Sequence, residues 1–468
     1  MSKHKFTDVR IPIEEGNPAI KRIEELCIKC GACRRVCETD SAVGRMYDLE
    51  SAGDNPICIH CGQCANVCPA HSITEQYEYT QVKKAIADPD KIVIFSTSPS
   101  VRVGLGEEFG LAAGAFVEGK MVASLRALGA NYVLDTNFSA DLTIMEEASE
   151  LVDRIANKTK PLPQFTSCCP AWVKFTETFF PQMLPHISTA KSPIGMQGPT
   201  IKTYFAKQNG IAPEKIVNVA VTPCTAKKFE IRRKEMNAAS RELNIPGMRD
   251  MDYVITTREL AKWLKEEGVD FNALAESGYD RLMGAASGAG VIFGNTGGVM
   301  EAAARTAYHF LTGKTPPGDF MNLMPVRGMD GIRSASVTIA GTPVRVAVVH
   351  GIDNAKQVLE DQAAGKCAYD FVEVMTCRGG CIGGGGQPKT HVPMTDEIRS
   401  ARISALYAKD NGMALRLSHD NPDITEVYRQ YYEKPLSPLA ERMLHTSYYD
   451  RSGDLGPKGV VEKPQTSQ

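Results

Sequence analysis

Residues 371-FVEVMTCRGGCIGGGGQP-388 combine a strand pattern with a cysteine pair and a run of glycines. The stretch opens with an apolar run that suits a buried strand, and two cysteines, Cys377 and Cys381, follow that run. Residues 383–386 are four consecutive glycines. Glycine permits positive φ and close backbone approach, so this composition beside two cysteines favours a loop that wraps a cofactor over a floppy connection.

Two further stretches place cysteines after strand-like runs. The first, 163-PQFTSCCPAW-172, holds Cys168 and Cys169 just before Pro170, a residue suited to the first turn of a helix. The second, 217-VNVAVTPCTAKKFE-230, places Cys224 at a strand end. Ligands gather at the carboxyl ends of strands in α/β proteins, so we expect the three loops to converge on one cofactor.

Strand-like and helical segments alternate from residue 91 onward. We expect strands at 91–98, 131–138 and 371–377, and a hairpin at 334–351. Helices are expected from 110 to 129, at 141–157, and at 258–268 behind a threonine cap. This alternation predicts an α/β core with at least partly parallel sheets.

The composition is that of an ordinary folded protein. Of 468 residues, 43% are hydrophobic and 23% are charged, and the formal net charge is −2. Such a chain can bury a large core and has no basic field for nucleic acid. We find no run of ~18 apolar residues that would span a membrane. The first residues contain no apolar secretory segment, which favours a cytoplasmic location.

Eight of the fourteen cysteines lie in two runs of identical spacing, Cys27-x2-Cys30-x2-Cys33-x3-Cys37 and Cys58-x2-Cys61-x2-Cys64-x3-Cys68. This is the bacterial ferredoxin spacing, in which the fourth cysteine of each run ligates the cluster of the other run. The runs therefore predict two [4Fe–4S] clusters. One has the ligands Cys27, Cys30, Cys33 and Cys68, and the other has Cys58, Cys61, Cys64 and Cys37.

Zinc is the alternative metal for this segment, but zinc sites usually pair CxxC units across a longer gap. His60, beside Cys61, is an alternative ligand, although a surface histidine that at most tunes the cluster is the simpler interpretation. The segment has little apolar sequence and is expected to need its metal to fold. Two adjacent clusters form an electron-transfer path, which implies that electrons pass to or from the rest of the chain.

The segments TSCCPAW, PCTAKKFE and EVMTCRGGCIGGGGQP resemble the three signature segments of the [FeFe] hydrogenases. The resemblance implies an H-cluster, which is a [4Fe–4S] cluster bridged to a diiron unit that carries CO, cyanide and an azadithiolate. The matching ligands are Cys169, Cys224, Cys377 and Cys381, with Cys381 as the bridge. Lys227 is expected to face a cyanide, with Glu230 beside it; outside such a motif Lys227 would be taken for a surface lysine.

The resemblance also implies a proton relay. Cys168 matches the cysteine that passes protons to the dithiolate, and the next members would be Glu147, Ser188, Glu150 and Arg154. The two glutamates and the arginine are spaced i, i+3 and i+7, hence on one helix face. Without the motifs, an exposed Glu/Arg face would be the simpler interpretation.

Further matching positions are expected to surround the cofactor: Ser98, Pro99, Ser100, Thr222, Phe293 and Met375. Plain core packing is the alternative for Phe293 and Met375. Thr222 stands where the best-known members have methionine, Ser98 where alanine is usual, and Ile194 where glutamine is common. These exchanges are expected to tune the cofactor and to mark a less-studied branch of the family.

The implied organisation has five parts. We expect a lead-in at 1–20, an α+β bacterial-ferredoxin-like domain at 21–85 and a catalytic α/β domain at 90–395. The catalytic domain has two lobes with partly parallel sheets around the H-cluster. A helical belt at 396–450, which some members carry as a separate small subunit, and a loose tail at 451–468 would follow.

The implied activity is reversible H2 oxidation and proton reduction. Electrons would pass through the two [4Fe–4S] clusters to or from a ferredoxin-type carrier, and maturation proteins would supply the diiron unit. No dinucleotide-binding fingerprint follows a strand, so direct use of NAD(P) is not expected. The alternatives are a cluster-assembly protein or a hydrogen sensor that keeps the iron–sulfur ligands without significant turnover.

Overall fold

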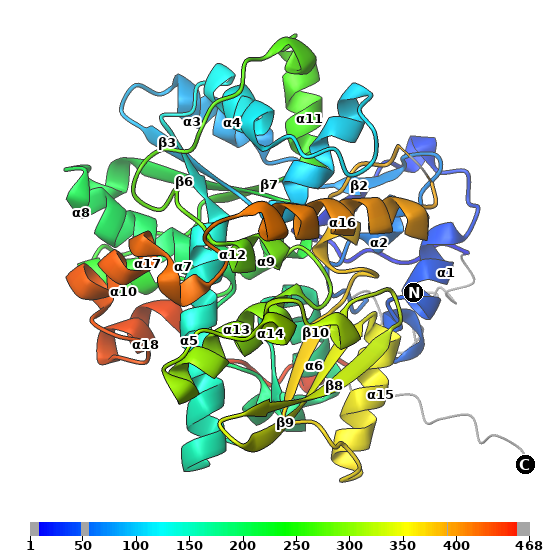
Figure 1. The fold of residues 1–468 in the computed structure, drawn as a ribbon. Helices are drawn as coiled ribbons and strands as arrows, with labels where there is room; N and C mark the ends of the chain where they lie inside the picture. Colours follow the sequence, from blue (N-terminus) through cyan, green and yellow to red (C-terminus); the bar gives the residue numbers. More distant parts are fainter. Residues whose placement is uncertain (1–8, 48–55, 391, 456–468) are drawn as a thin grey trace, which may run out of the picture.

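The computed structural model describes residues 9–47, 56–390 and 392–455. Two four-stranded sheets form the cores of two lobes, drawn in the upper and lower halves of Figure 1. The upper sheet is fully parallel. Its strands, in spatial order, are β4 (Tyr132–Asp135), β3 (Ile92–Thr97), β6 (Ile216–Thr222) and β7 (Tyr253–Thr256).

The lower sheet is mixed. Its spatial order is β5 (Gln164–Phe165), β10 (Phe371–Met375), β9 (Thr342–His350) and β8 (Ile332–Ile339). Strands β5, β10 and β9 run parallel, whereas β8 and β9 form the expected antiparallel hairpin. The expectation of an α/β fold with partly parallel sheets is therefore confirmed.

Helices cover both sheets and join the lobes. Helix α5 (Thr136–Asn157) is long, runs from the upper lobe into the lower one in Figure 1, and packs against α7 (Pro193–Thr200) and α13 (Gly298–Thr312). The others up to residue 363 are α3 (Tyr79–Ala87), α4 (Glu118–Ala127), α6 (Pro170–Phe179), α8 (Ala206–Gln208), α9 (Ala226–Glu230), α10 (Ala238–Leu243), α11 (Thr257–Glu266), α12 (Gly288–Ile292), α14 (Gly318–Met321) and α15 (Ile352–Ala363).

The N-terminal part is a small α+β unit at the right edge of Figure 1. Its antiparallel strands β1 (Ile20–Arg22) and β2 (Ile73–Glu75) flank α1 (Ala32–Thr39) and α2 (Gln63–Asn66). Residues expected to be a lead-in join its core, since Ile11 and Ala19 are buried there. The boundary expected at residue 85 falls inside α3, whose Tyr79 and Val82 pack in the upper lobe.

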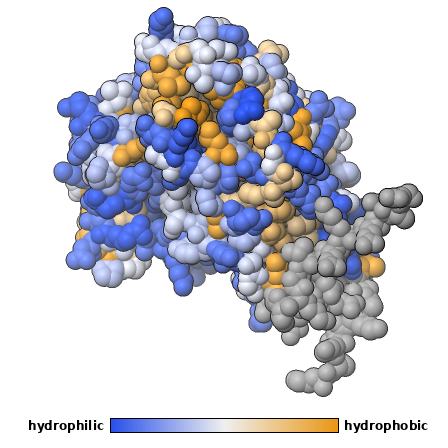
Figure 2. Space-filling view, turned by 90° about the horizontal axis from the view of Figure 1, so that it is seen from below, coloured by the Kyte–Doolittle hydropathy of each residue, from blue (hydrophilic) through white to orange (hydrophobic). Residues whose placement is uncertain are grey.

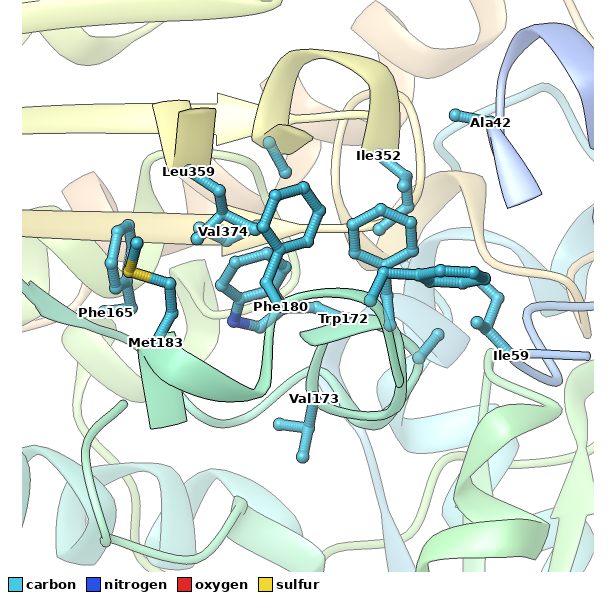
Figure 3. Close-up of a cluster of buried hydrophobic side chains, with 14 of the residues drawn as sticks. Ala42, Ile59, Phe165, Trp172, Val173, Phe180, Met183, Ile352, Leu359 and Val374 are labelled. Atoms are coloured by element: carbon cyan, nitrogen blue, oxygen red, sulfur yellow. The ribbon is translucent and has the colours of Figure 1, made fainter. Parts of the chain in front are cut away.

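One apolar core ties the N-terminal part to the lower lobe. Figure 3 shows Trp172 of α6 among aromatic and aliphatic side chains, with Val374 of β10 and Leu359 of α15 in the same cluster. Ala42 and Ile59 enter this cluster from the N-terminal part. Because side chains from four separate segments share this buried volume, the N-terminal part is held in a fixed position on the lobe.

The C-terminal segment packs on the two lobes with α16 (Asp396–Gly412), α17 (Pro422–Val427) and α18 (Pro438–Leu444). The loose tail was expected to begin at residue 451, but residues 451–455 are packed against the protein. Arg451 donates a hydrogen bond to buried Glu177 over 2.7 Å, and Leu455 is buried in the core of Figure 3. The remainder of the expected tail, 456–468, lies outside the described residues.

Two expected elements begin elsewhere. The helix expected from residue 110 starts only at Glu118, because Gly110 and Gly114 adopt positive φ values of 80° and 79°. The helix expected from residue 141 starts at Thr136, because the Asp135 carboxylate accepts the backbone N–H of Asn137 and caps α5; the strand expected through Phe138 therefore ends at Asp135. The expected threonine cap is present, since Thr256 and Glu259 form a capping box at α11.

Apolar side chains interrupt a largely hydrophilic surface on the face drawn in Figure 2. None of the helices formed by the described residues combines the length and apolar character needed to cross a bilayer.

Candidate active site

The three cysteine-bearing loops meet at one cavity, at the carboxyl ends of strands from both sheets. Cys377 and Cys381 follow β10, Cys224 follows β6, and Cys169 is the N-cap of α6. The cavity has a volume of about 80 Å³, counted as the space open to the centres of water molecules. The structure therefore brings together the four cysteines that the sequence assigned to one cofactor.

Most other expected site residues line the same cavity. They are Cys168, Lys227, Ser98, Pro99, Ser100, Thr222, Ile194, Phe293 and Met375. Glu230 stands behind Lys227 rather than at the cavity wall. Gly380 makes part of the wall with a φ of 92°, and a Cβ there would lie 2.5 Å from the backbone nitrogen of Thr296. Gly380 is thus required by both conformation and space, and residues 383–386 by space alone.

The Lys227 ammonium is held at the cavity by two acceptors. Its Nζ donates to the Cys168 carbonyl over 2.9 Å and to Glu230 Oε2 over 2.8 Å. Burial opposes the charged form, but the neighbouring Glu230 outweighs it and raises the pKa of Lys227. Two bonds leave one of the three ammonium protons free for an anionic group in the cavity.

The expected relay residues are buried in the protein behind the cavity. Glu147, Glu150 and Arg154 lie on one side of α5 and are all buried, which excludes the exposed-face interpretation. Ser188 Oγ donates to Glu150 Oε2 over 2.7 Å, and Arg154 Nη2 donates to Glu150 Oε1 over 2.7 Å. At the inner end, the Glu147 charge contributes to the raised pKa of Cys168.

The two relay glutamates differ in their protonation. Burial and the charge of Glu150 raise the pKa of Glu147 to about 8, and both of its carboxyl oxygens lack a hydrogen-bond partner. Burial would also raise the pKa of Glu150, but Arg154 and Lys160 lower it to about 2. Burial raises the pKa of the Cys168 thiol well above its usual range. Near neutral pH Cys168 and Glu147 therefore carry their protons, whereas Glu150 is ionised.

The N-terminal cysteines lie close together in space. Cys27, Cys30, Cys33 and Cys68, the first predicted set, line one small cavity. Burial raises the pKa of the Cys64 thiol well above its usual range, and the neighbouring thiols of Cys61, Cys58, Cys37 and Cys33 raise it further. His60 is buried rather than at the surface: its Nε2 lies 2.7 Å from Glu14 Oε1, and its ring stacks on Phe229.

The N-terminal part directly contacts residues 379–387, which are called the glycine loop. Gly62 packs against Gly385, so closely that a Cβ on Gly385 would overlap the Cys61 carbonyl. Gln63 Nε2 donates to Cys377 Sγ over 3.2 Å and to the Gly383 carbonyl over 3.0 Å. Sequence reasoning missed Gln63, because its position between two ligand cysteines gave no sign of a contact more than 300 residues away.

Thr376, which was also missed, places its Oγ1 3.2 Å from Cys169 Sγ. Because Thr376 directly precedes Cys377, its position in the sequence could have indicated a residue of the site. The donor set suits the H-cluster: four thiols, one ammonium with a free proton, and an otherwise largely apolar wall. Thiolates are the ligands that iron–sulfur clusters require, and a lysine cation suits anionic cyanide.

Comparison with known families assigns nearly the whole chain. Residues 91–385 match the iron only hydrogenase large subunit, C-terminal domain. Residues 396–451 match the iron hydrogenase small subunit, and residues 19–69 match a 4Fe-4S dicluster domain.

Relatives include the subunit HndD of an NADP-reducing hydrogenase from Solidesulfovibrio fructosivorans, 44% identical over 95% of this chain and 69% of the relative. The periplasmic [Fe] hydrogenase large subunit of Nitratidesulfovibrio vulgaris is 46% identical over 84% of this chain and 91% of its own length. The cytosolic iron-sulfur assembly component 3 of Bos taurus is more distant, at 33% identity over 78% of this chain and 76% of that protein.

Among solved structures, a variant of the apo [FeFe]-hydrogenase HydA1 of Chlamydomonas reinhardtii has a TM-score of 0.70 and 40% sequence identity to this chain. The match covers 80% of this chain and all of that one. Together with the large-subunit match over residues 91–385, this shows that the chain belongs to the iron-only, or [FeFe], hydrogenase family, with the H-cluster and two [4Fe–4S] clusters of that family as its cofactors.

Proposed function

We propose that this chain is a hydrogenase that interconverts H2 with protons and electrons and exchanges the electrons with a ferredoxin-type carrier. The observation that carries the proposal is the set of buried groups Cys168, Glu147, Ser188 and Glu150, which leads from the four-cysteine cavity toward the surface at Lys160. A protein that only stores or transfers iron–sulfur clusters has no use for such a set.

When bound, the H-cluster would supply the iron site at which H2 forms or splits and the amine that exchanges a proton with the protein. Cys169, Cys224, Cys377 and Cys381 would hold its cubane, with Cys381 as the bridge to the diiron unit. Lys227, fixed by Glu230, would donate a hydrogen bond to a cyanide. Ser98, Pro99, Ser100, Thr222, Phe293 and Met375 would enclose the unit and limit access of water.

The chain's own groups would move the proton. Cys168 would exchange it with the cofactor amine and with Glu147, whose carboxyl is protonated near neutral pH and is not tied by another hydrogen bond. The Ser188 hydroxyl, which now donates to Glu150, would link the two carboxyls by turning between them. General acid–base groups need this combination of hydrogen-bond reach and matched pKa.

Electrons would travel through the N-terminal clusters. The set of Cys58, Cys61, Cys64 and Cys37 lies next to the catalytic cavity through the Gly62–Gly385 contact, and the set that contains exposed Cys30 lies farther out. A small protein carrier could reach the outer set, which supports a ferredoxin-type carrier. The identity of the carrier is tested by comparing the rates of H2 evolution with reduced ferredoxin, NADPH and a reduced redox dye as electron donors.

The first experiment is an infrared spectrum of the anaerobically matured protein. Bands from iron-bound CO and cyanide are expected, together with H2 evolution from reduced methyl viologen. A control hydrogenase must be loaded by the same maturation system. If the control shows these bands and this chain does not, the proposal is wrong and a role in cluster assembly or sensing takes its place.

The relay is tested by Cys168→Ala. We expect H2 evolution to fall by a factor of ~100 or more, because a lost acid–base group costs about that much, while the infrared bands remain. Cys367→Ala, at a half-buried thiol outside the cavity, is the matched control and should keep its rate. Near-normal turnover of the Cys168 variant would remove Cys168 from the relay.

A further inference from the structure

The carboxylate of Glu150 accepts four hydrogen bonds. Its Oε1 receives Arg154 Nη2 at 2.7 Å and Lys160 Nζ at 2.9 Å. Its Oε2 receives Ser188 Oγ at 2.7 Å and the backbone N–H of Thr189 at 3.0 Å. A carboxylate offers about four lone-pair positions, so Glu150 has no free position for an incoming proton. One donor must leave before Glu150 can be protonated.

Three of the four donors cannot open Glu150 to solvent. The Arg154 side chain has an exposed fraction of 0%. Its guanidinium also donates to the carbonyls of Pro161, Pro185, His186 and Ile187. Ser188 is fully buried, so a turn of its hydroxyl toward Glu147 frees a position on Oε2 that solvent does not reach. The Thr189 donor is a backbone amide and cannot swing away.

Lys160 is the donor that can leave. Its side chain is 41% exposed, and its only other hydrogen bond within the described residues is a long one, 3.3 Å to Thr189 Oγ1. Lysine carries its charge on a flexible four-carbon stem and can re-form its solvation in water. When the pair opens, the ammonium of this exposed side chain passes into water and leaves no unsolvated charge behind on the lysine.

We propose that Lys160 is the gate of the proton relay: its ammonium closes the outer end of Glu150, and its departure frees the lone pair through which solvent protonates that carboxylate. In the open state a hydronium ion donates to Glu150 Oε1 and leaves as water, while Lys160 stays protonated. This inference rests on the proposed relay and assigns its outer end a residue that the family motifs do not contain.

Other charged groups face the same end of the relay. Asp153 on α5 is near Lys160, and Glu147 lies on the inner side of Glu150. From the C-terminal segment, Tyr448 is close to Glu150, and His445 Nδ1 lies 2.9 Å from Thr189 Oγ1. His445 Nε2 in turn contacts Glu146 Oε2 at 3.0 Å, and Glu441 lies 4.0 Å from its Nδ1. All of these remain in place when Lys160 is replaced.

The test compares matured Lys160→Met, Lys160→Arg and wild-type enzymes in the methyl viologen assay across pH, at low and high salt. Loss of one of the two cations beside Glu150 should move the alkaline limb of H2 evolution upward by ~1 pH unit. Lys160→Arg should retain the wild-type profile. Salt screens an exposed ion pair, so raised ionic strength should shift the wild-type profile toward that of Lys160→Met and leave the variant unchanged.

A second readout does not depend on turnover. After a pH jump, the CO bands of the resting enzyme should relax several-fold faster in Lys160→Met than in wild type, because no gate has to open. Lys158→Met, at an exposed lysine two residues earlier, is the matched control and should behave as wild type.

Superimposable pH profiles and relaxation rates of Lys160→Met and wild type would overturn the gate. An equal shift in Lys160→Met and Lys160→Arg would also overturn it, since the charge would then not be responsible. Failure of the proposed function is distinct: it would appear as absence of CO bands and of H2 evolution in the wild-type protein itself.

Discussion

Two glutamates one turn apart on α5 have opposite acid–base properties. Both are buried, and burial alone would raise both pKa values. Glu150 meets Arg154 and Lys160 and stays ionised, whereas Glu147 finds no cation and keeps its proton to about pH 8. The environment rather than the residue type therefore assigns the two positions, as expected of paired carboxyl groups with separate roles.

This difference predicts opposite effects on stability. The folded-state pKa of Glu147 is raised, so the unfolded chain binds fewer protons and wild-type stability falls as pH rises from about 4.5 to about 8. Glu147→Gln should therefore unfold at a higher temperature than wild type at pH 8, with a gain of a few kcal/mol that disappears near pH 4.

Glu150→Gln is the contrasting variant. The pKa of Glu150 is lowered to about 2, so its contribution is present above about pH 4.5 and is lost as pH falls toward 2. This variant should be destabilised at neutral pH by ~3 kcal/mol, because Arg154 remains buried without its carboxylate. Thermal unfolding followed by circular dichroism across pH checks both; changes of the same sign in the two variants would contradict the assignment.

Among the secondary-structure elements, α11 has a function that its position in the upper lobe does not reveal. Arg258, in its first turn, donates to Glu75 of β2 over 2.9 Å and to Asn66 Oδ1 of α2 over 2.7 Å. The same guanidinium donates to the carbonyls of Gly385 and Gln387 in the glycine loop. One side chain thus clamps the N-terminal part to the loop that follows Cys381.

Arg258→Ala should uncouple electron transfer from the active site. Glu75, which is 1% exposed, would remain buried without its cation, at a cost of about 3–5 kcal/mol. We expect carrier-linked H2 evolution to fall at least tenfold, whereas isotope exchange between H2 and D2O, which needs no electrons from the N-terminal clusters, should persist.

Lys in place of Arg258 should restore little, because a single ammonium cannot replace the guanidinium fork. Arg442→Ala, which removes the exposed pair with Glu242, is the matched control and should leave both rates unchanged. Parallel loss of carrier-linked activity and isotope exchange in Arg258→Ala would mean that the clamp supports the cavity itself rather than electron transfer.

At the scale of the whole molecule, metal and polypeptide share the work of holding the parts together. The N-terminal core contains few apolar side chains, of which Val36 and Ile73 are examples, and two of its buried members are Cys64 and Cys68, the proposed cluster ligands. The lobes have much larger cores, including the one in Figure 3. The two regions should therefore differ in how far their folding depends on iron.

The fully loaded protein should contain about 14 iron atoms per chain: three clusters of four and a diiron unit. Removal of iron by a chelator under denaturant-free conditions should make residues 20–75 sensitive to protease while the lobes stay resistant. Iron analysis with limited proteolysis and mass spectrometry checks this. Cleavage spread evenly over lobes and N-terminal part would show that the lobes need the metal equally.

The family, its cofactors and the candidate ligands could all be predicted from the sequence. Cysteine spacing carries the ligand sets, because a cluster ligated from a short loop constrains neighbours in the chain, and Cys27, Cys30, Cys33 and distant Cys68 do line one cavity. The strand ends before Cys169, Cys224 and Cys377 were readable from apolar runs, and parallel strands bring such ends together. Hydrophobic periodicity did not predict the starts of α4 and α5. Gly110 and Gly114, with positive φ, delay the start of α4, and the capping carboxylate of Asp135 sets the start of α5.

Tertiary structure alone decided which groups are charged and which parts touch. Lys160, Gln63 and Arg258 belong to no metal-ligand pattern, yet they contact Glu150, Cys377 and the glycine loop, respectively. The residues that Gln63 and Arg258 meet in this way are more than a hundred positions away along the chain. A pKa depends on burial and on charges within a few ångströms, and both arise only when separate segments are packed together.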